Sequence, residues 1–201
     1  MSKSIKGTKT EKHLLESFAG ESQARMRYTY FASKAKKEGF EQIAAIFAET
    51  ADNEKEHAER FFKFLEGGPL EITGTFPAGI ISDTVEDLRL SASGENEEYT
   101  KLYPTAAKVA DEEGFPEIAE CFRRICVAEQ HHESRYLELL DNLKNDRVFK
   151  KDMPIKWKCR NCGYVYESKE ALEKCPACLH PKAYMEELAD NFQICLIKVK
   201  H

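Results

Sequence analysis

The sequence lacks any long hydrophobic run, since no stretch approaches the ~18 apolar residues that a membrane-spanning helix needs. Its first residues, MSKSIKGTKTEKHLLE, are charged and hold no apolar core of a secretion signal. A basic excess is also missing, because 35 acidic residues outnumber 30 lysines and arginines and give a net charge of -5. We therefore expect a cytoplasmic protein that enters no membrane and binds no nucleic acid.

No motif of the GxGxxG type is present, so the chain is not expected to hold a dinucleotide itself. Cysteines are few and odd in number, seven among 201 residues, which argues against a disulfide framework. Four of them form two CxxC pairs near the C-terminus. The other three are expected to pack as small apolar residues: Cys121, Cys126 and Cys195.

Four helices are predicted between residues 10 and 145, because apolar residues recur there with a period of 3.6. Glycine or proline stands at their ends. The first two helices, and the last two, are joined by one or two residues, so each pair must be antiparallel neighbours. The predicted spans are about 11–38, 40–66, 84–113 and 116–143.

The segment 67–82, rich in glycine, proline and threonine, joins the two helix pairs. Extended, it could reach about 50 Å, whereas a helix of about 25 residues is roughly 38 Å long. It can therefore cross the whole bundle. Helical composition with one long crossover predicts a mainly α, ferritin-like four-helix bundle over residues 1–145.

The two halves of this bundle repeat one another. Glu21 corresponds to Glu95 at an offset of 74, whereas Tyr28 corresponds to Tyr103 at an offset of 75. The second half thus holds one extra residue, which a continuous helix houses most simply as a π-helical turn. Pro104, which cannot donate a backbone hydrogen bond, lies just beyond and fits such a turn.

Carboxylates and histidines recur on the apolar faces of all four helices. Two helices carry glutamates and the other two carry ExxH, in which residues three apart share a face. Several buried carboxylates need a counter-charge, and this ligand set is that of ferritin-like di-iron proteins. Carboxylate with imidazole suits iron or manganese. The predicted metal ligands are Glu21, Glu54, His57, Glu95, Glu98, Glu129 and His132.

Glu98 is the additional carboxylate, because Ala24 stands at its place in the first half. The other four carboxylates neutralise two ferrous ions, and a fifth offsets part of the extra charge of two ferric ions. We therefore expect a site that changes oxidation state. Tyr28 and Tyr103 are expected to orient ligating carboxylates rather than only to fill the core. Three further histidines are expected to lie at the surface or in a second layer around the site: His13, His131 and His201.

A small second domain is predicted over residues 157–201, after a linker at 146–156. Its two CxxC pairs, 12 residues apart, predict a tetrahedral thiolate site. Zinc would make that site structural and iron would make it a one-electron carrier, and the spacing does not decide between them. The ligands are Cys159, Cys162, Cys175 and Cys178.

Together these motifs resemble the rubrerythrin family over essentially the whole chain. The two cysteine segments are similar to those of a rubredoxin-type iron site. The bundle motifs that carry the resemblance are Gly20-Glu21, Glu54-Lys-Glu-His57, Gly94-Glu95-Asn-Glu-Glu98-Tyr99 and Glu129-Gln-His-His132.

The resemblance implies a non-haem di-iron peroxidase that protects against oxidative stress by reducing hydrogen peroxide to water. Electrons would come from an external donor, which is an NAD(P)H-linked reductase or a rubredoxin, and would pass through the rubredoxin-type iron. Catalytic roles would fall to Glu98, His57, Tyr28 and Tyr103, with Glu98 replacing His57 on one iron upon oxidation. Family members form dimers, so a homodimer or larger homo-oligomer is expected. Two alternatives stay open: a ferroxidase of ferritin type and a non-catalytic module with zinc in the thiolate site.

Overall fold

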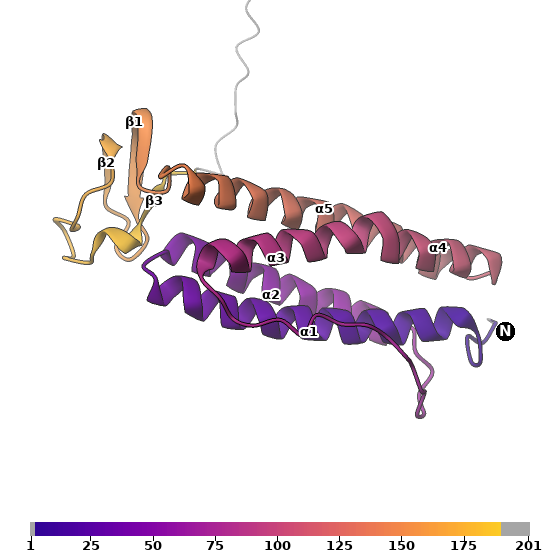
Figure 1. Cartoon of the computed structure of the whole chain (residues 1–201). Helices are drawn as coiled ribbons and strands as arrows, with labels where there is room; N and C mark the ends of the chain where they lie inside the picture. Colours follow the sequence, from indigo (N-terminus) through magenta and orange to yellow (C-terminus); the bar gives the residue numbers. More distant parts are fainter. Residues whose placement is uncertain (1–2, 190–201) are drawn as a thin grey trace, which may run out of the picture.

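Figure 1 shows the computed structural model of the chain, of which residues 3–189 are described here. The mainly α, ferritin-like bundle with a long crossover and a small C-terminal domain is confirmed. Cys195 and His201 lie outside the described residues, so the predictions for them stay predictions. The helical elements of the bundle are α1 (Lys9–Lys37), α2 (Glu41–Phe62), α3 (Thr84–Glu97), the π-helical turn η1 (Glu98–Leu102), α4 (Tyr103–Glu112) and α5 (Pro116–Lys144), and the small domain holds one 3-10 turn, η2 (Lys182–Tyr184).

The helix ends follow local chemistry. Thr8 and Asp83 cap α1 and α3, since their side-chain oxygens accept the backbone N–H three residues further along. The second helix is shorter than predicted, because it ends at Phe62 and not near residue 66. There the chain tightens, and the N–H groups of Phe64 and Leu65 each bond a carbonyl three residues back.

The predicted π-helical turn is confirmed. It occupies Glu98–Leu102, between α3 and α4, and the N–H of Tyr103 bonds the carbonyl of Glu98 five residues back. Pro104 follows in the first turn of α4, where its missing N–H is tolerated. The extra residue of the second repeat is thus absorbed without breaking the helical path.

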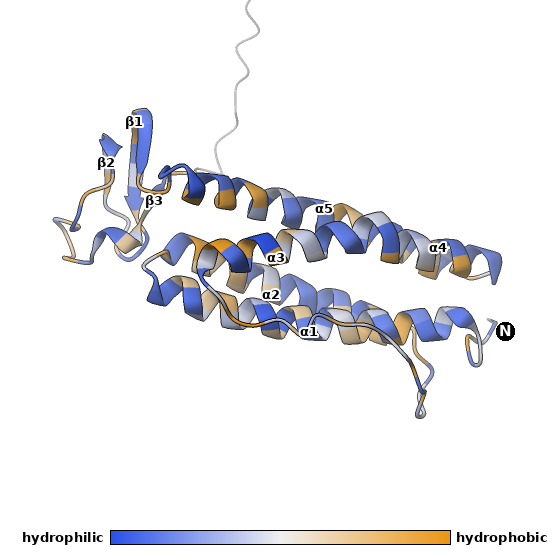
Figure 2. Cartoon of the chain, viewed as in Figure 1, coloured by the Kyte–Doolittle hydropathy of each residue, from blue (hydrophilic) through white to orange (hydrophobic). Residues whose placement is uncertain are grey.

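The bundle core is divided into two apolar clusters. One contains Phe47 and Tyr136, and the other contains Phe61 and Phe122. Every helix of the bundle carries both hydrophobic and hydrophilic residues along its length (Figure 2), as expected of helices with one face in the core. The crossover runs along the outside of α1 and α3 (Figure 1). None of the helices within residues 3–189 is long and apolar enough to cross a membrane.

The small domain is a three-stranded antiparallel sheet in the order β2-β1-β3. Trp157 is fully buried in its core. This domain lies at the end of the bundle where α1 turns into α2 (Figure 1), and the ring of Phe149 stacks on that of Phe40. The strands are β1 (Lys150–Cys159), β2 (Val165–Glu170) and β3 (Met185–Glu187).

Strand β1 begins at Lys150, inside the stretch 146–156 that we predicted to be a linker. The pairing with β2 is irregular, because the register shifts between Lys150 and Ile155. A strand interrupted by a bulge carries no clean alternation of apolar and polar residues. The second half of the predicted linker is therefore part of the sheet.

Candidate metal centre

The predicted carboxylates and histidines meet in the middle of the bundle as two groups of four side chains. Within each group, one ligand atom per residue lies within 4.8 Å of the others. Glu54 and Glu129 belong to both groups, as two carboxylates that bridge adjacent metal ions would. The groups are Glu21, Glu54, His57 and Glu129, and Glu54, Glu95, Glu129 and His132.

Each shared carboxylate turns one oxygen to each histidine. Nδ1 of His57 lies 3.0 Å from Oε2 of Glu54 and 2.9 Å from Oε1 of Glu129. Nδ1 of His132 lies 3.2 Å from Oε1 of Glu54 and 2.8 Å from Oε2 of Glu129. The imidazole rings are 6.0 Å apart between centroids. The geometry is therefore that of two adjacent positions sharing two carboxylates.

The donor set fits a pair of metal ions, because it is largely buried and several of its atoms have no hydrogen-bond partner. The side chains of Glu21, Glu95 and Glu129 are fully buried. Several oxygens of these groups, and Nδ1 of His132, lie at ion-pair distance from one another but make no well-aligned hydrogen bond. Buried polar atoms of this kind are costly unless something binds them. Two cations placed between the groups would satisfy these atoms and balance the negative charge.

In the metal-free protein, the pKa values of Glu95 and His132 are raised, so both side chains retain a proton at neutral pH. Burial raises the pKa of Glu95 to about 8, with the charge of Glu54 acting in the same direction. Burial lowers the pKa of His132, but the carboxylates of Glu129, Glu54 and Glu95 outweigh it and raise that pKa to about 12. Metal ions therefore compete with these protons for the same atoms.

Tyr28 and Tyr103 each bond a carboxylate that lies in the other half of the bundle. The hydroxyl of Tyr103, on α4, donates to Oε1 of Glu21 on α1 at 2.5 Å. The hydroxyl of Tyr28, on α1, donates to Oε1 of Glu95 on α3. Each bond leaves the second carboxylate oxygen without a partner. Each tyrosine therefore contacts one carboxylate, as a role in orienting ligands requires, and the two carboxylates held in this way are those that belong to one group only.

Glu98 is the predicted ligand that the structure does not bring into either group. It lies half-buried at the start of η1, in the wall of a pocket that also contains Arg27. Burial and then the charge of Glu95 raise its pKa well above the usual range, and Arg27 opposes them. His57 thus occupies the cluster while Glu98 lies beside it.

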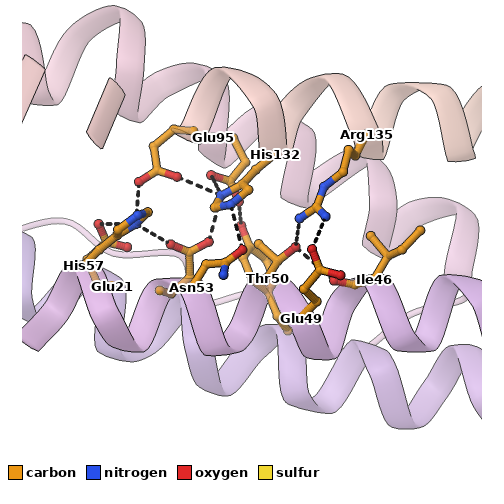
Figure 3. A network of polar contacts seen from close by, with 12 residues as sticks. Glu21, Ile46, Glu49, Thr50, Asn53, His57, Glu95, His132 and Arg135 are labelled. Atoms are coloured by element: carbon orange, nitrogen blue, oxygen red, sulfur yellow. Dashed lines mark hydrogen bonds and ion pairs between the residues drawn. The ribbon is translucent and has the colours of Figure 1, made fainter. Parts of the chain in front are cut away.

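A polar network around His132 was not anticipated. Its Nε2 lies 3.3 Å from Oδ1 of Asn53, so Asn53 can hold the ring with Nδ1 facing the carboxylates. Figure 3 shows this network continuing to Arg135, which donates to Thr50 and to Glu49. Asn53 precedes a ligand by one position, and such a position normally points away from the ligand's helix face. Only the packing of α2 against α5 brings the two side chains together.

The four predicted cysteines also converge, with their Sγ atoms within 4.8 Å of one another. Cys159 and Cys175 are fully buried, whereas Cys162 is exposed. The backbone N–H of His180 lowers the pKa of Cys178 to about 6, which favours the thiolate that binds metal. Among the remaining cysteines and histidines, Cys121 and Cys126 are half-buried, and His131 is exposed.

Comparison with known proteins matches both parts of the chain. The rubrerythrin family model covers residues 12–140, and the model of the rubrerythrin rubredoxin-like domain covers residues 157–186. A rubrerythrin of Porphyromonas gingivalis is 63% identical over 96% of both chains. A rubrerythrin of Nitratidesulfovibrio vulgaris is 59% identical over 94% of this chain and 100% of its own.

Comparison with solved structures points to the same family of proteins. The fully reduced, all-ferrous state of nigerythrin superposes with a TM-score of 0.61 at 30% identity, over 92% of each chain. The buried carboxylate and histidine cluster accordingly provides the di-iron centre, and the four cysteines provide the rubredoxin-like iron site. Because both family models match in order and the relatives are similar over nearly the whole length, the chain belongs to the rubrerythrin family of di-iron oxidoreductases.

Proposed function

We propose that this protein is a peroxidase that reduces hydrogen peroxide to water and protects a cytoplasm from oxidative stress. The observation that carries the proposal is the pair of buried groups that share Glu54 and Glu129. Reduction of an O–O bond takes two electrons, and two adjacent irons held by these groups would supply both. A ferritin-type ferroxidase needs no tethered electron carrier, so the four-cysteine domain favours the peroxidase.

Residues around the site limit its contact with water and fix the orientation of its carboxylates. Apolar clusters that include Tyr28 and Tyr103 surround the buried carboxylates and limit the access of water to them. Tyr28 and Tyr103 hold Glu95 and Glu21 in fixed orientations. Orientation of this kind lets the metal pair change oxidation state without rearranging most of its ligands.

We propose that one metal position changes its ligand with oxidation state, and that the two ligands are His57 and Glu98. His57 belongs to one group through its contacts with Glu54 and Glu129. Glu98 lies outside both groups, on the π-helical turn. Two ferric ions carry two more positive charges than two ferrous ions, so a carboxylate is favoured over an imidazole in the oxidised state. The proposal is that these side chains serve one metal position in different oxidation states.

Electrons would arrive from NAD(P)H through a separate reductase and the four-cysteine iron, and a second copy of the chain would complete the path. Phe40, at the start of α2, touches the small domain, and Glu54 lies 14 residues further along. At 1.5 Å per residue this is roughly 20 Å within one chain. A hollow of about 490 Å³ lies over His57, next to Arg60 and Arg124. The four-cysteine domain of a partner subunit could approach the cluster there.

An anaerobic single-turnover experiment tests the peroxidase. The protein is loaded with iron and fully reduced, one equivalent of hydrogen peroxide is added, and the visible spectrum is followed by stopped flow. We expect fast oxidation of the di-iron site, followed by growth of the red ferric tetrathiolate colour as its electron is withdrawn. Oxidation by dioxygen alone would indicate the ferroxidase, and a colourless thiolate site would indicate the zinc module.

A further inference from the structure

A pocket of about 360 Å³ lies beside the metal centre, under the crossover. Glu98 and Tyr103 are part of its wall, and Tyr103 also bonds Glu21 in the cluster. Its outer wall is the crossover segment 73–77, which contributes Phe76 and Pro77. The volume lies in the range of small-molecule sites. Hydrogen peroxide is little larger than water, whose share of liquid volume is about 30 Å³, and it needs far less room.

Two helix glycines open this pocket, and neither is required by the backbone. Gly20 in α1 and Gly94 in α3 both line it. Neither has a positive φ, and a Cβ built on either would meet nothing within 4 Å. Close packing of helices therefore does not explain them. Glycine inside a helix costs about 1 kcal/mol relative to alanine. What the two glycines provide is empty volume next to Glu98.

A third glycine shapes the outer wall. A Cβ on Gly74 would lie 2.8 Å from Cε2 of Phe76, so the glycine leaves room for the Phe76 ring beside the crossover backbone. The ring, with Pro77 and Leu102, gives the pocket a largely apolar lining. Charged side chains also line the pocket, such as Glu16, Glu97 and Lys101. Glu98 is the carboxyl group that lies beside the metal centre. A mostly apolar pocket with polar groups in its wall suits a molecule with an apolar body and a polar tip.

We propose that this pocket binds organic hydroperoxides, with the alkyl or aryl group against Phe76 and Leu102 and the O–O group toward Glu98. The inference rests on the proposed peroxidase function and names a further substrate class for it. The reaction is ROOH + 2 electrons + 2 protons giving ROH and water. The O–O bond breaks, and the electrons are those that the reduced metal pair supplies to hydrogen peroxide.

Kinetics with two substrates test the proposal. The iron-loaded protein is assayed with hydrogen peroxide and with cumene hydroperoxide, as native chain, Gly94→Ala and Gly94→Phe. We expect all three to act on hydrogen peroxide. Gly94→Phe fills the pocket and should lower the ratio of kcat/KM for cumene hydroperoxide to that for hydrogen peroxide by about tenfold or more. Gly94→Ala should leave the ratio unchanged. Gly20→Phe fills the same pocket from α1 and replaces Gly94→Phe if that variant does not fold.

Binding provides a readout independent of turnover. The product alcohol of cumene hydroperoxide, 2-phenyl-2-propanol, is titrated into each metal-loaded variant and followed by saturation-transfer NMR. We expect binding to the native chain and to Gly94→Ala, and its loss in the phenylalanine variant. This inference would be overturned if the protein turned over hydrogen peroxide but neither bound the alcohol nor turned over cumene hydroperoxide. The proposed peroxidase function would then still stand. Binding of the alcohol without turnover of either peroxide would overturn the proposed function instead.

Discussion

The hydroxyl of Tyr103 donates to Oε1 of Glu21 at 2.5 Å, although 82 residues separate the two in the chain. The other oxygen, Oε2, is buried and has no hydrogen-bond partner. Tyr103 therefore fixes the orientation of the carboxylate and leaves one oxygen for a metal. Tyr28 stands in the same relation to Glu95.

Tyr103→Phe should keep both metals and lower peroxidase turnover about tenfold, as loss of a group that orients a metal ligand commonly does. Iron content and steady-state turnover are the measurements. Tyr136→Phe is the matched control, because Tyr136 is equally buried but makes no hydrogen bond to a carboxylate of either group. Equal turnover in both variants would show that Tyr103 only fills space.

Glu98→Ala should retain two metals, because Glu98 belongs to neither group of four, and should lose at least about tenfold in turnover. The loss is expected since no carboxylate would then offset the added charge of the oxidised pair. Metal analysis and stopped-flow oxidation by peroxide check both parts. Glu56→Ala, at an exposed carboxylate beside His57, is the control. Unchanged turnover in Glu98→Ala would refute its redox-dependent role.

The helical spacing and the internal repeat predicted which residues meet. Residues three apart share a helix face, so ExxH on two helices places its side chains together whatever the details of packing. The one-residue offset between the repeats predicted the π-helical turn at Glu98–Leu102, which the structure confirms. Such inferences succeed because they depend on helix geometry alone.

What the sequence could not predict depends on how helices rotate against one another. The contact between Asn53 and His132 crosses from α2 to α5. The position of Glu98 outside both groups depends on the path of η1. Strand β1 begins in a charged stretch, and its pairing with β2 shifts register between Lys150 and Ile155, which hides the period of the strand. None of these leaves a periodic signal in the sequence.

Removing the metal from the cysteine site should unfold the small domain and leave the bundle helical. Its core is small, and metal ligation supplies much of the folding free energy of such domains. Trp157 is the only tryptophan of the chain and is fully buried in that core, so its fluorescence reports on this domain alone. We expect chelation under reducing conditions to red-shift its emission while the far-UV circular dichroism keeps its helical signal. If the emission of Trp157 stayed at the short wavelength of a buried tryptophan after complete metal loss, this prediction would be wrong.

Two glutamates, one in each half of the bundle, make equivalent hydrogen bonds to a threonine of the other half. Glu38 accepts hydrogen bonds from the N–H and hydroxyl of Thr84, and Glu113 accepts the same pair from Thr10. Burial acts in the opposite direction, but these bonds lower the pKa of both carboxyls. A lowered folded pKa contributes stability above the unfolded pKa, and this is lost as the pH falls through the folded value.

Glu38→Gln and Glu113→Gln should therefore each lower the free energy of unfolding by about 1 kcal/mol at neutral pH. The difference from the native chain should shrink as the pH falls below about 4.3, the usual pKa of glutamate. Urea unfolding of metal-free protein between pH 7 and pH 3 measures it. Glu112→Gln, at an exposed neighbour of Glu113, should change little at any pH. A constant difference across the pH range would mean that the charge of the carboxylates is unimportant.

Mixing two inactive variants distinguishes electron transfer between subunits from transfer within one chain. Cys162→Ser removes a ligand of the four-cysteine iron, and Glu129→Ala removes a carboxylate shared by both metal positions. Each variant alone should lack steady-state turnover with an external electron donor. If electrons pass between the subunits of a dimer, a mixed dimer pairs the intact carrier of one chain with the intact di-iron site of the other. Random pairing of equal amounts should restore about a quarter of native turnover, since half of the dimers are mixed and each holds one working pair.

Transfer within one chain predicts no restoration at any mixing ratio, because every chain then lacks either its carrier or its di-iron site. The subunits must be exchanged for the test to count, and mass spectrometry of the intact dimers measures that exchange. A second mixture, Cys162→Ser with Cys175→Ser, is the matched control. It contains intact di-iron sites but no intact carrier, so it should stay inactive however the subunits pair. Restored turnover in the first mixture alone would place the carrier of one subunit against the metal centre of the next.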